Sequence, residues 1–188
     1  MDALVYDLEI VKGILGKGDT PVEGIEYCKG WNDHKNMGIS VLCAYDYVDD
    51  RMRVFCEDNL DEFLELCCGR RYLISFNGIG FDNKVIECYD KRNLLPIGSR
   101  QYDILQEIWK VTGRCKLGGL DGMCELNGIG GKTGHGALAP VHWQQGKIGN
   151  VIDYCCQDVM LTKKLFDLSQ EGPIKSPKGG TLRLRSIQ

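Results

Sequence analysis

The sequence has no long apolar run. No stretch of about eighteen apolar residues occurs among the 188 residues, so neither a membrane-spanning helix nor a membrane partner is expected. The opening MDALVYDLEI has no basic segment before its short apolar run, and a secretory signal is not expected. Hydrophobic residues make up 43% and charged residues 26% of the chain, which is typical of a soluble globular domain.

The cysteine pattern lacks the spacings of zinc and thiol-redox sites. Ten cysteines are present, but no CxxC pair occurs among them. Several lie in apolar stretches such as VLCAY and LELCC, so we expect reduced core residues that behave as small hydrophobes. Such cysteines favour a reducing, intracellular (cytoplasmic) location.

A large positive charge is also missing. The formal net charge of −3 argues against a protein that holds nucleic acid by bulk charge alone. It does not exclude a nuclease, because catalytic carboxylates add negative charge that bound metal ions offset. Local positive charge remains at Arg70-Arg71, at Lys163-Lys164 and in the C-terminal tail.

The order of the predicted elements indicates an α/β fold. The expected strands cover residues 3–8, 38–48, 51–55, 71–76 and the first part of 101–112. The expected helices cover residues 60–68, 81–93, the second part of 101–112 and 151–170. An antiparallel hairpin with parallel crossovers makes a mixed central sheet that helices flank.

Local signals place the helix starts, the loops and the tail. Asn59 with Glu62 resembles a capping box, and Asn150 is the candidate cap of the last long helix. Residues 11–38 are expected to form a loop, as is part of 117–136, which contains eight glycines. The tail is expected to end in a strand at 181–187.

A pair of carboxylates ends the first predicted strand. Asp7 and Glu9 alternate along it, so both side chains point to one face and repel each other. A divalent cation is the usual reason for such a pair. A solvent-exposed face at the strand end is the alternative.

Two further motifs carry acidic residues on predicted helices. Asp82 opens a helix, where its charge also suits the helix dipole without any function. Tyr154 and Asp158 are spaced i,i+4 beside an apolar stripe, so Asp158 faces inward or toward a cleft edge. An unpaired buried carboxylate is costly, and a metal ion would resolve that cost.

The motifs D-x-E, N-x-x-x-F-D and Y-x-x-x-D, in this order, resemble those of the DEDD superfamily of 3′→5′ exonucleases. That superfamily includes the proofreading exonucleases of DNA polymerases. The intervening stretches are similar to an RNase H-like branch found standalone or attached to helicases, and the resemblance covers residues 3–172. One branch of the superfamily has His five residues before the last Asp, where Asp153 stands here. Tyr154 places the sequence in the tyrosine (DEDDy) branch.

The resemblance implies a fold, an activity and a metal site. It implies an RNase H-like exonuclease domain at 1–172, with 173–188 as a tail. Asp7, Glu9, Asp82 and Asp158 would hold two Mg²⁺ or Mn²⁺ ions, about 3.5–4 Å apart. Tyr154 would orient the attacking water, because a phenol is a poor base at neutral pH. The substrate would be single-stranded nucleic acid with a free 3′ end, DNA slightly favoured over RNA, and the products nucleoside 5′-monophosphates.

The resemblance also suggests residues that bind the substrate. Asn77 and Phe81 match positions that face the terminal nucleotide, and the backbone around Leu8 would contact its sugar. Phe81 fits base stacking and core packing about equally well. Lys132 and His135 lie in GGKTGHG, where they either touch a phosphate or belong to a solvated loop. Leu126 replaces the first glycine of a P-loop, so nucleotide binding of that kind is excluded.

Three alternatives remain open at this point. An RNase H-like endonuclease would share the metal chemistry, although a helical Y-x-x-x-D is not its usual pattern. A non-catalytic nucleic-acid-binding module would bind without turnover. An exonuclease that depends on a helicase or polymerase partner would hold nucleic acid weakly by itself.

Overall fold

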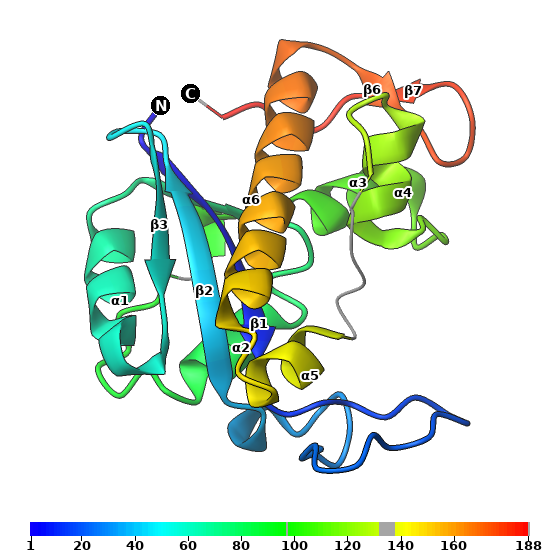
Figure 1. Ribbon diagram of the computed structural model, residues 1–188. Helices are drawn as coiled ribbons and strands as arrows, with labels where there is room; N and C mark the ends of the chain where they lie inside the picture. The colour runs from blue at the N-terminus through cyan, green and yellow to red at the C-terminus, as the bar shows by residue number, and fades with distance from the viewer. Residues whose placement is uncertain (97, 132–137, 188) are drawn as a thin grey trace.

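A five-stranded mixed sheet forms the centre of the computed structural model, which describes residues 1–96, 98–131 and 138–187 (Figure 1). The strands are β1 (Ala3–Ile10), β2 (Ile39–Asp46), β3 (Arg51–Phe55), β4 (Tyr72–Ser75) and β5 (Gln101–Asp103). Their order is β3-β2-β1-β4-β5. The pairs β1–β2 and β2–β3 are antiparallel, whereas β1–β4 and β4–β5 are parallel. The predicted mixed sheet is confirmed.

Helices cover both faces of the sheet (Figure 1). They are α1 (Leu60–Cys68), α2 (Asp82–Glu87), α3 (Ile104–Thr112), α4 (Gly119–Leu126), α5 (Ala139–Gln144) and α6 (Ile148–Glu171). Short 3-10 turns occupy His34–Asn36, Glu57–Asn59 and Gly98–Arg100. One hydrophobic cluster lies between the sheet and α6, and a second lies between the sheet and α1 and α2.

The central strand β1 determines which face carries the carboxylates. Its side chains alternate, so Leu4, Tyr6 and Leu8 pack on the α1 side while Ala3 and Val5 pack on the α6 side. Asp7 and Glu9 continue the row of Ala3 and Val5 and therefore lie on the face that α6 covers. The alternation of side chains along β1 thus places both acidic residues on the face toward α6.

The long helix α6 crosses the sheet close to β1 and β2. It ends at Glu171, as the Glu-Gly-Pro signal predicts. Its start was predicted wrongly, because the helix begins at Ile148 after Lys147 and Asn150 lies inside the first turn. A tight turn after α5, in which the Lys147 N–H bonds to the His142 carbonyl, brings the chain into the helix early.

The capping role predicted for Asn59 also needs correction. Asn59 precedes α1 but makes no side-chain cap of that helix. Its Oδ1 instead accepts a hydrogen bond from the Cys56 N–H at 2.7 Å and closes the 3-10 turn before the helix. The 3-10 turn ends at Asn59 itself, so the Asn59 side chain bonds within that turn instead of capping α1.

The glycine-rich segment holds a helix, α4, that begins at the second of two adjacent glycines. Gly118 and Gly119 both have positive φ, 72° and 71°, a conformation that glycine adopts without steric cost. The neighbouring helix α5 was not predicted. The tail forms a separate two-stranded ribbon, β6 (Ile174–Lys175) with β7 (Thr181–Leu182), so its strand is shorter than the predicted 181–187.

All ten cysteines are free. Cys43, Cys67, Cys124 and Cys155 are buried, as expected for small hydrophobic residues. The expectation of core positions is wrong for two others, because Cys68 and Cys88 are exposed. Cys68 follows a buried cysteine on α1, and one residue along a helix turns a side chain by about 100° and out of the core. No helix in the described part of the chain is long and apolar enough to cross a bilayer.

Candidate functional site

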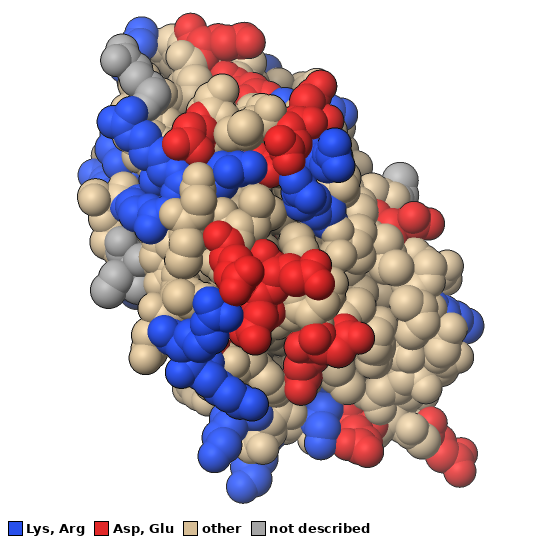
Figure 2. All heavy atoms as spheres, turned by 90° about the vertical axis from the view of Figure 1, so that its left-hand side faces the viewer, with Lys and Arg blue, Asp and Glu red and all other residues tan. Residues whose placement is uncertain are grey.

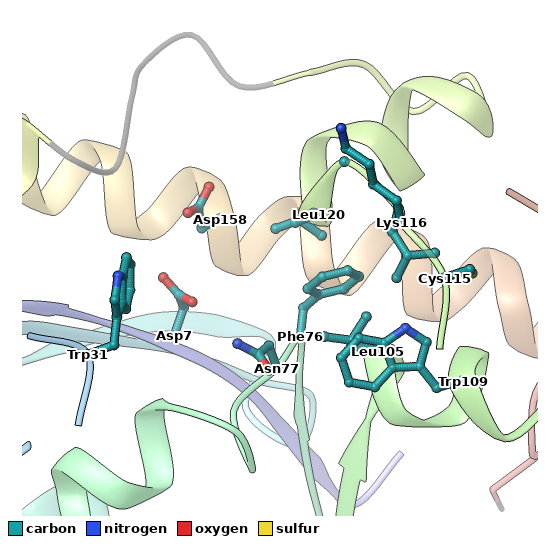
Figure 3. A pocket seen from close by; sticks show the side chains of 13 residues that line it. Asp7, Trp31, Phe76, Asn77, Leu105, Trp109, Cys115, Lys116, Leu120 and Asp158 are labelled. Carbon is teal, nitrogen blue, oxygen red and sulfur yellow. The ribbon is translucent and has the colours of Figure 1, made fainter. Parts of the chain in front are cut away.

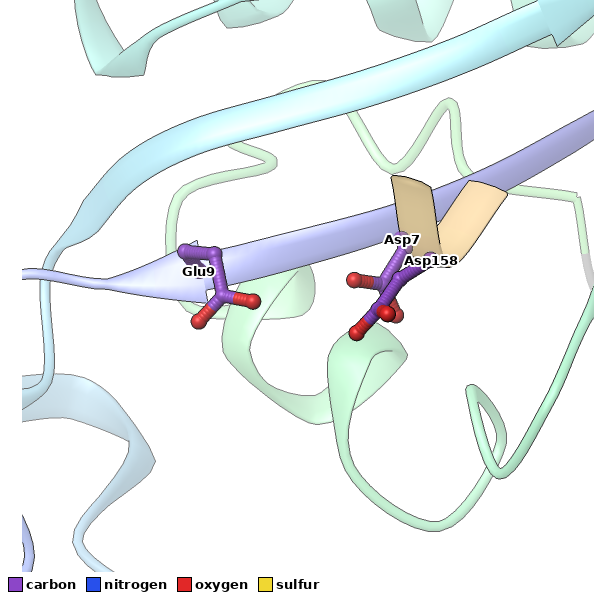
Figure 4. A group of neighbouring side chains, drawn as sticks. All are labelled: Asp7, Glu9 and Asp158. Carbon is purple, nitrogen blue, oxygen red and sulfur yellow. The ribbon is translucent and has the colours of Figure 1, made fainter. Parts of the chain in front are cut away.

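Three carboxylates meet at the end of β1. Oxygen atoms of Asp7, Glu9 and Asp158 all lie within 4.8 Å of one another (Figure 4). Glu9 and Asp158 are buried, at 9% and 4% exposure, and Asp7 is partly exposed. The sequence predicted that Asp158 faces inward or toward a cleft edge, and its side chain is buried and lines a pocket. Such a group of oxygen donors is suited to a hard divalent cation.

Helix α6 brings Asp158 to the strand through a close contact one turn earlier. The Cys155 thiol donates to the backbone carbonyl of Asp7 at 3.4 Å and lies 4.0 Å from its Oδ2. On the neighbouring strand β2, Cys43 pairs with Asp7 in register and its sulfur lies 3.5 Å from that of Cys156. Small thiol side chains therefore allow the helix to approach the acidic end of β1 closely.

Asp82 stands beside the group of three carboxylates rather than within it. It opens α2, is 5% exposed, and its Oδ1 accepts the Leu8 N–H at 3.1 Å. Burial raises the pKa of Asp82 to about 7, and the charges of Asp103 and Asp158 add to the rise against backbone hydrogen bonds that lower it. A nearby cation would favour the ionised form of this carboxyl.

Tyr154 lies one turn before Asp158 on α6. It is partly buried and packs against the hydrophobic cluster between α6 and the sheet. The exposed Asp153 precedes it, at the position where the other branch of the resembled superfamily has His. The role of Tyr154 in orienting water remains a prediction.

A pocket of about 640 Å³ opens beside the carboxylates (Figure 3). Asp7 and Asp158 line it, and among the predicted substrate contacts that the structure describes, Asn77 lines it as well. Sequence reasoning missed several other lining residues, which are Trp31, Phe76, Trp109 and Lys116. The available signal was Trp31 itself, a large aromatic in a polar, glycine-rich loop, which is 65% exposed.

The loop after β4 is held in place by Asp103. The Asn77 and Ile79 N–H groups donate to the two carboxylate oxygens of Asp103 at 2.9 and 3.1 Å. The same carboxylate accepts the Leu105 N–H at 3.0 Å and caps α3. Asn77 has a φ of 69°, and this anchoring keeps it in that conformation at the wall of the pocket.

The other predicted substrate residues lie in different surroundings. The Leu8 side chain is buried on the α1 side, and its N–H is donated to Asp82. Phe81 is partly buried against the same cluster, with the Trp31 ring edge-on at 5.8 Å. Trp31 lines the pocket, whereas Phe81 is not one of its lining residues. Lys132 and His135 fall outside the described residues.

Comparisons with known proteins support the fold. No protein-family profile matches the chain, and no curated protein matches it. The chain is similar to the family B DNA polymerase from the hyperthermophilic archaeon Pyrobaculum calidifontis, with a TM-score of 0.62 and 16% identity. The match covers 88% of this chain and 24% of the polymerase, so the chain spans about a quarter of that protein. The fold is RNase H-like, as predicted.

Proposed function

We propose that this protein is a divalent-metal-dependent 3′→5′ exonuclease that hydrolyses single-stranded nucleic acid to nucleoside 5′-monophosphates. The observation that carries the proposal is the meeting of Asp7, Glu9 and Asp158 within 4.8 Å beside an open pocket. A pocket at that place gives a polymer end access to any cation that the carboxylates hold. The similarity to a DNA polymerase fits this proposal and makes DNA the first substrate to test.

The donor set fits Mg²⁺ or Mn²⁺. Asp7, Glu9 and Asp158 offer carboxylate oxygens, which hard cations prefer, and Asp82 beside them would help to hold a second ion. When bound, the ions would activate water and stabilise the charge that develops on the phosphoryl group. Burial of Glu9 and Asp158 limits competing hydration of these carboxylates.

The remaining residues would position the substrate and the water. In this proposal the Tyr154 hydroxyl orients the attacking water by a hydrogen bond, and Asp158 one turn later shares its helix face. Asn77 contacts the terminal nucleotide from the pocket wall. Phe81 contributes through its edge contact with Trp31, whose ring borders the pocket where the terminal base would lie.

The decisive experiment uses 5′-labelled single-stranded DNA and RNA oligonucleotides of one sequence. Each is incubated with Mg²⁺, Mn²⁺ or EDTA, with wild-type protein, Asp7→Ala and the exposed-site control Asp153→Ala. We expect a ladder that shortens from the 3′ end, is lost with EDTA and with Asp7→Ala, and persists with Asp153→Ala. Full activity of Asp7→Ala would show that the site is assigned wrongly.

A second substrate separates exonuclease from endonuclease. An oligonucleotide with a phosphate-blocked 3′ end should resist the proposed exonuclease, whereas an RNase H-like endonuclease would still cut it. Metal-dependent binding without cleavage of any substrate would instead indicate a binding module or an enzyme that needs a helicase or polymerase partner.

A further inference from the structure

The carboxylates divide the large pocket into two unequal sides. In Figure 3, Trp31 lies on one side of Asp7 and Asp158, while Phe76, Trp109 and Lys116 lie on the other. A bond that is cut at the carboxylates therefore has protein surface on both sides of it. The part of the substrate upstream of that bond must leave along one of them.

Each side continues into a smaller depression that shares a tryptophan with the large pocket. Beyond Trp31 lies a depression lined by residues 29–33, with Lys29 and Asp33 as its charged residues. Beyond Trp109 lies a depression of about 360 Å³ that is lined by Gln106, Trp109, Lys110 and Arg114. Trp31 and Trp109 thus each line two depressions, and the three depressions follow one another in a series that we call the track.

Charge distinguishes the two ends of this track. The depression beyond Trp31 is lined by one cation and one anion, whereas the one beyond Trp109 is lined by Lys110 and Arg114 and no acid. Lys116 adds a third cation on the Trp109 side. On the face that carries α1 and β3, acidic and basic side chains are interleaved (Figure 2). Lys110 is paired with Glu107 at 2.7 Å, so Arg114 and Lys116 are the cations suited to a phosphate backbone beside the partly exposed Trp109.

Trp109 itself has the properties of a stacking platform. It is partly exposed on α3, and the Arg114 guanidinium lies 5.3 Å from the centre of its ring. Its Nε1 is shielded from solvent and finds no acceptor among residues 1–96, 98–131 and 138–187. The shielded Nε1 edge packs into the protein, so the partly exposed part of the ring is what a base can contact.

We propose that the single strand upstream of the cleaved bond leaves the carboxylates along Trp109, Lys116 and Arg114, with one base stacked on Trp109. This inference rests on the proposed function for the position of the cleaved bond. The proposed path implies that the substrate is a strand of several nucleotides and not a dinucleotide. In this proposal Trp31 contacts the terminal nucleotide, on the other side of the carboxylates.

Binding of 5′-labelled single-stranded DNA of two, four, six and eight nucleotides tests the path. The measurement is fluorescence anisotropy with Ca²⁺ in place of Mg²⁺, which separates binding from cleavage. Wild-type affinity should rise from two to about six nucleotides. Trp109→Ala should weaken binding of the longer strands by about 5- to 150-fold and leave the dinucleotide unchanged, and Trp109→Phe should restore part of the loss.

A salt titration adds a measurement that a purely structural role of Lys116 would leave unchanged. Lys116→Ala should reduce the slope of log affinity against log salt by about 0.7, the contribution of one phosphate contact on a single strand. Lys164→Ala removes the same charge beside a separate depression of the protein and should leave the slope unchanged.

The outcomes separate the path from the activity. Equal weakening of all lengths by Trp109→Ala, or loss of the length dependence in Trp31→Ala and not in Trp109→Ala, would overturn the path. A 3′ ladder with wild-type protein would still support the exonuclease in that case. Length-dependent binding through Trp109 without a ladder would support the path and contradict the activity.

Discussion

The Leu8 N–H donates a hydrogen bond to Oδ1 of Asp82 across 3.1 Å, although 74 residues separate the two. Pairing of β1 with β4 ends at Val5, so beyond it the carboxylate takes the place of a strand neighbour. The same contact fixes Asp82 beside Asp7 and Glu9. One hydrogen bond thus satisfies the Leu8 N–H of β1 beyond the end of its pairing with β4, and it positions an acidic residue of the site.

Replacing Asp82 by Asn should stabilise the metal-free protein at neutral pH. The pKa of Asp82 is raised to about 7 by burial, against about 3.9 in an unfolded chain, so the folded state binds more protons between these values. Wild-type stability therefore falls as pH rises through this window, whereas Asn keeps the oxygen for Leu8 and stays neutral. The difference in unfolding free energy should be near zero below pH ~4 and reach up to roughly 4 kcal/mol above pH ~7.

Urea unfolding in EDTA across this pH range measures the effect. With Mg²⁺ added, the difference in unfolding free energy between Asp82→Asn and wild type should become smaller or change sign. The ionised carboxyl helps the wild-type protein to hold the ions, and ion binding stabilises the folded state. A constant difference between the two proteins at all pH values would contradict the raised pKa of Asp82.

Removal of Arg70 should expose the cost of a buried charge. Asp46 is fully buried and accepts hydrogen bonds from Arg70 Nε and Nη2 at 2.9 and 2.8 Å. Burial by itself would raise the pKa of Asp46, but the Arg70 hydrogen bond, the Val48 N–H and the charges of Arg70 and Arg53 lower it below the usual value. Arg53 Nη2 still lies 3.4 Å from Asp46 Oδ2, so Arg70→Ala should cost at most about 3–5 kcal/mol at pH 7, the cost of an uncompensated buried charge.

The pH dependence of this loss has a definite sign. Because the pKa of Asp46 is lower in the folded protein than the unfolded value of about 3.9, the ionised carboxyl stabilises the fold above that value. This stabilisation is lost as the pH falls through the folded pKa. The gap between wild type and Arg70→Ala should therefore shrink below pH ~4. Arg71→Ala is the control, because Arg71 is exposed and lies over the Tyr72 ring; a surface change of this kind costs about 0.5 kcal/mol or less. Equal losses in the two variants would contradict the buried pair.

Periodicity was sufficient to predict the sheet and the faces on which Asp7, Glu9 and Asp158 lie. Strands with a period of two placed Asp7 and Glu9 on one face, and helical spacing placed Asp158 inward. Both inferences depend only on local geometry, which repeats along the chain. The mixed sheet followed from the order of the elements in the same way.

The pocket could not be predicted, because its walls come from segments without periodicity. Trp31 lies in the loop between β1 and β2, and Lys116 in the link between α3 and α4. Their positions around one pocket depend on tertiary packing; the Gln144 side chain, for example, donates to the backbone carbonyls of Val11 and Glu26 and so ties the loop after β1 to α5. Asn59 was misassigned because a polar side chain can serve either of two adjacent turns, and Asn150 because the turn after α5 starts the helix earlier.

Gly78 should tolerate no side chain. A Cβ at this position would lie 2.3 Å from the Ser75 hydroxyl and 3.0 Å from that of Tyr6, where the chain turns back on β4. Gly78→Ala should cost about 1–3 kcal/mol and shift Asn77. A Cβ at Gly149, on α6, would meet no atom within 4 Å among the described residues. Gly149→Ala should therefore leave the unfolding free energy unchanged or raise it by up to about 1 kcal/mol. Thermal unfolding compares them, and Ser75→Gly should restore part of the Gly78→Ala loss.

Tyr154→Phe distinguishes a role in positioning water from a role in packing. The ring packs against the cluster between α6 and the sheet, so the variant should keep its melting temperature within a few degrees and keep its affinity for Mn²⁺. If the hydroxyl orients the water, kcat should fall by about 10- to 100-fold while KM changes little, as for an interaction made mainly in the transition state. Asp153→Ala, at the neighbouring exposed position, should leave both constants unchanged. A raised KM with unchanged kcat in Tyr154→Phe would place the hydroxyl in substrate binding instead, and the attacking water would then need another partner.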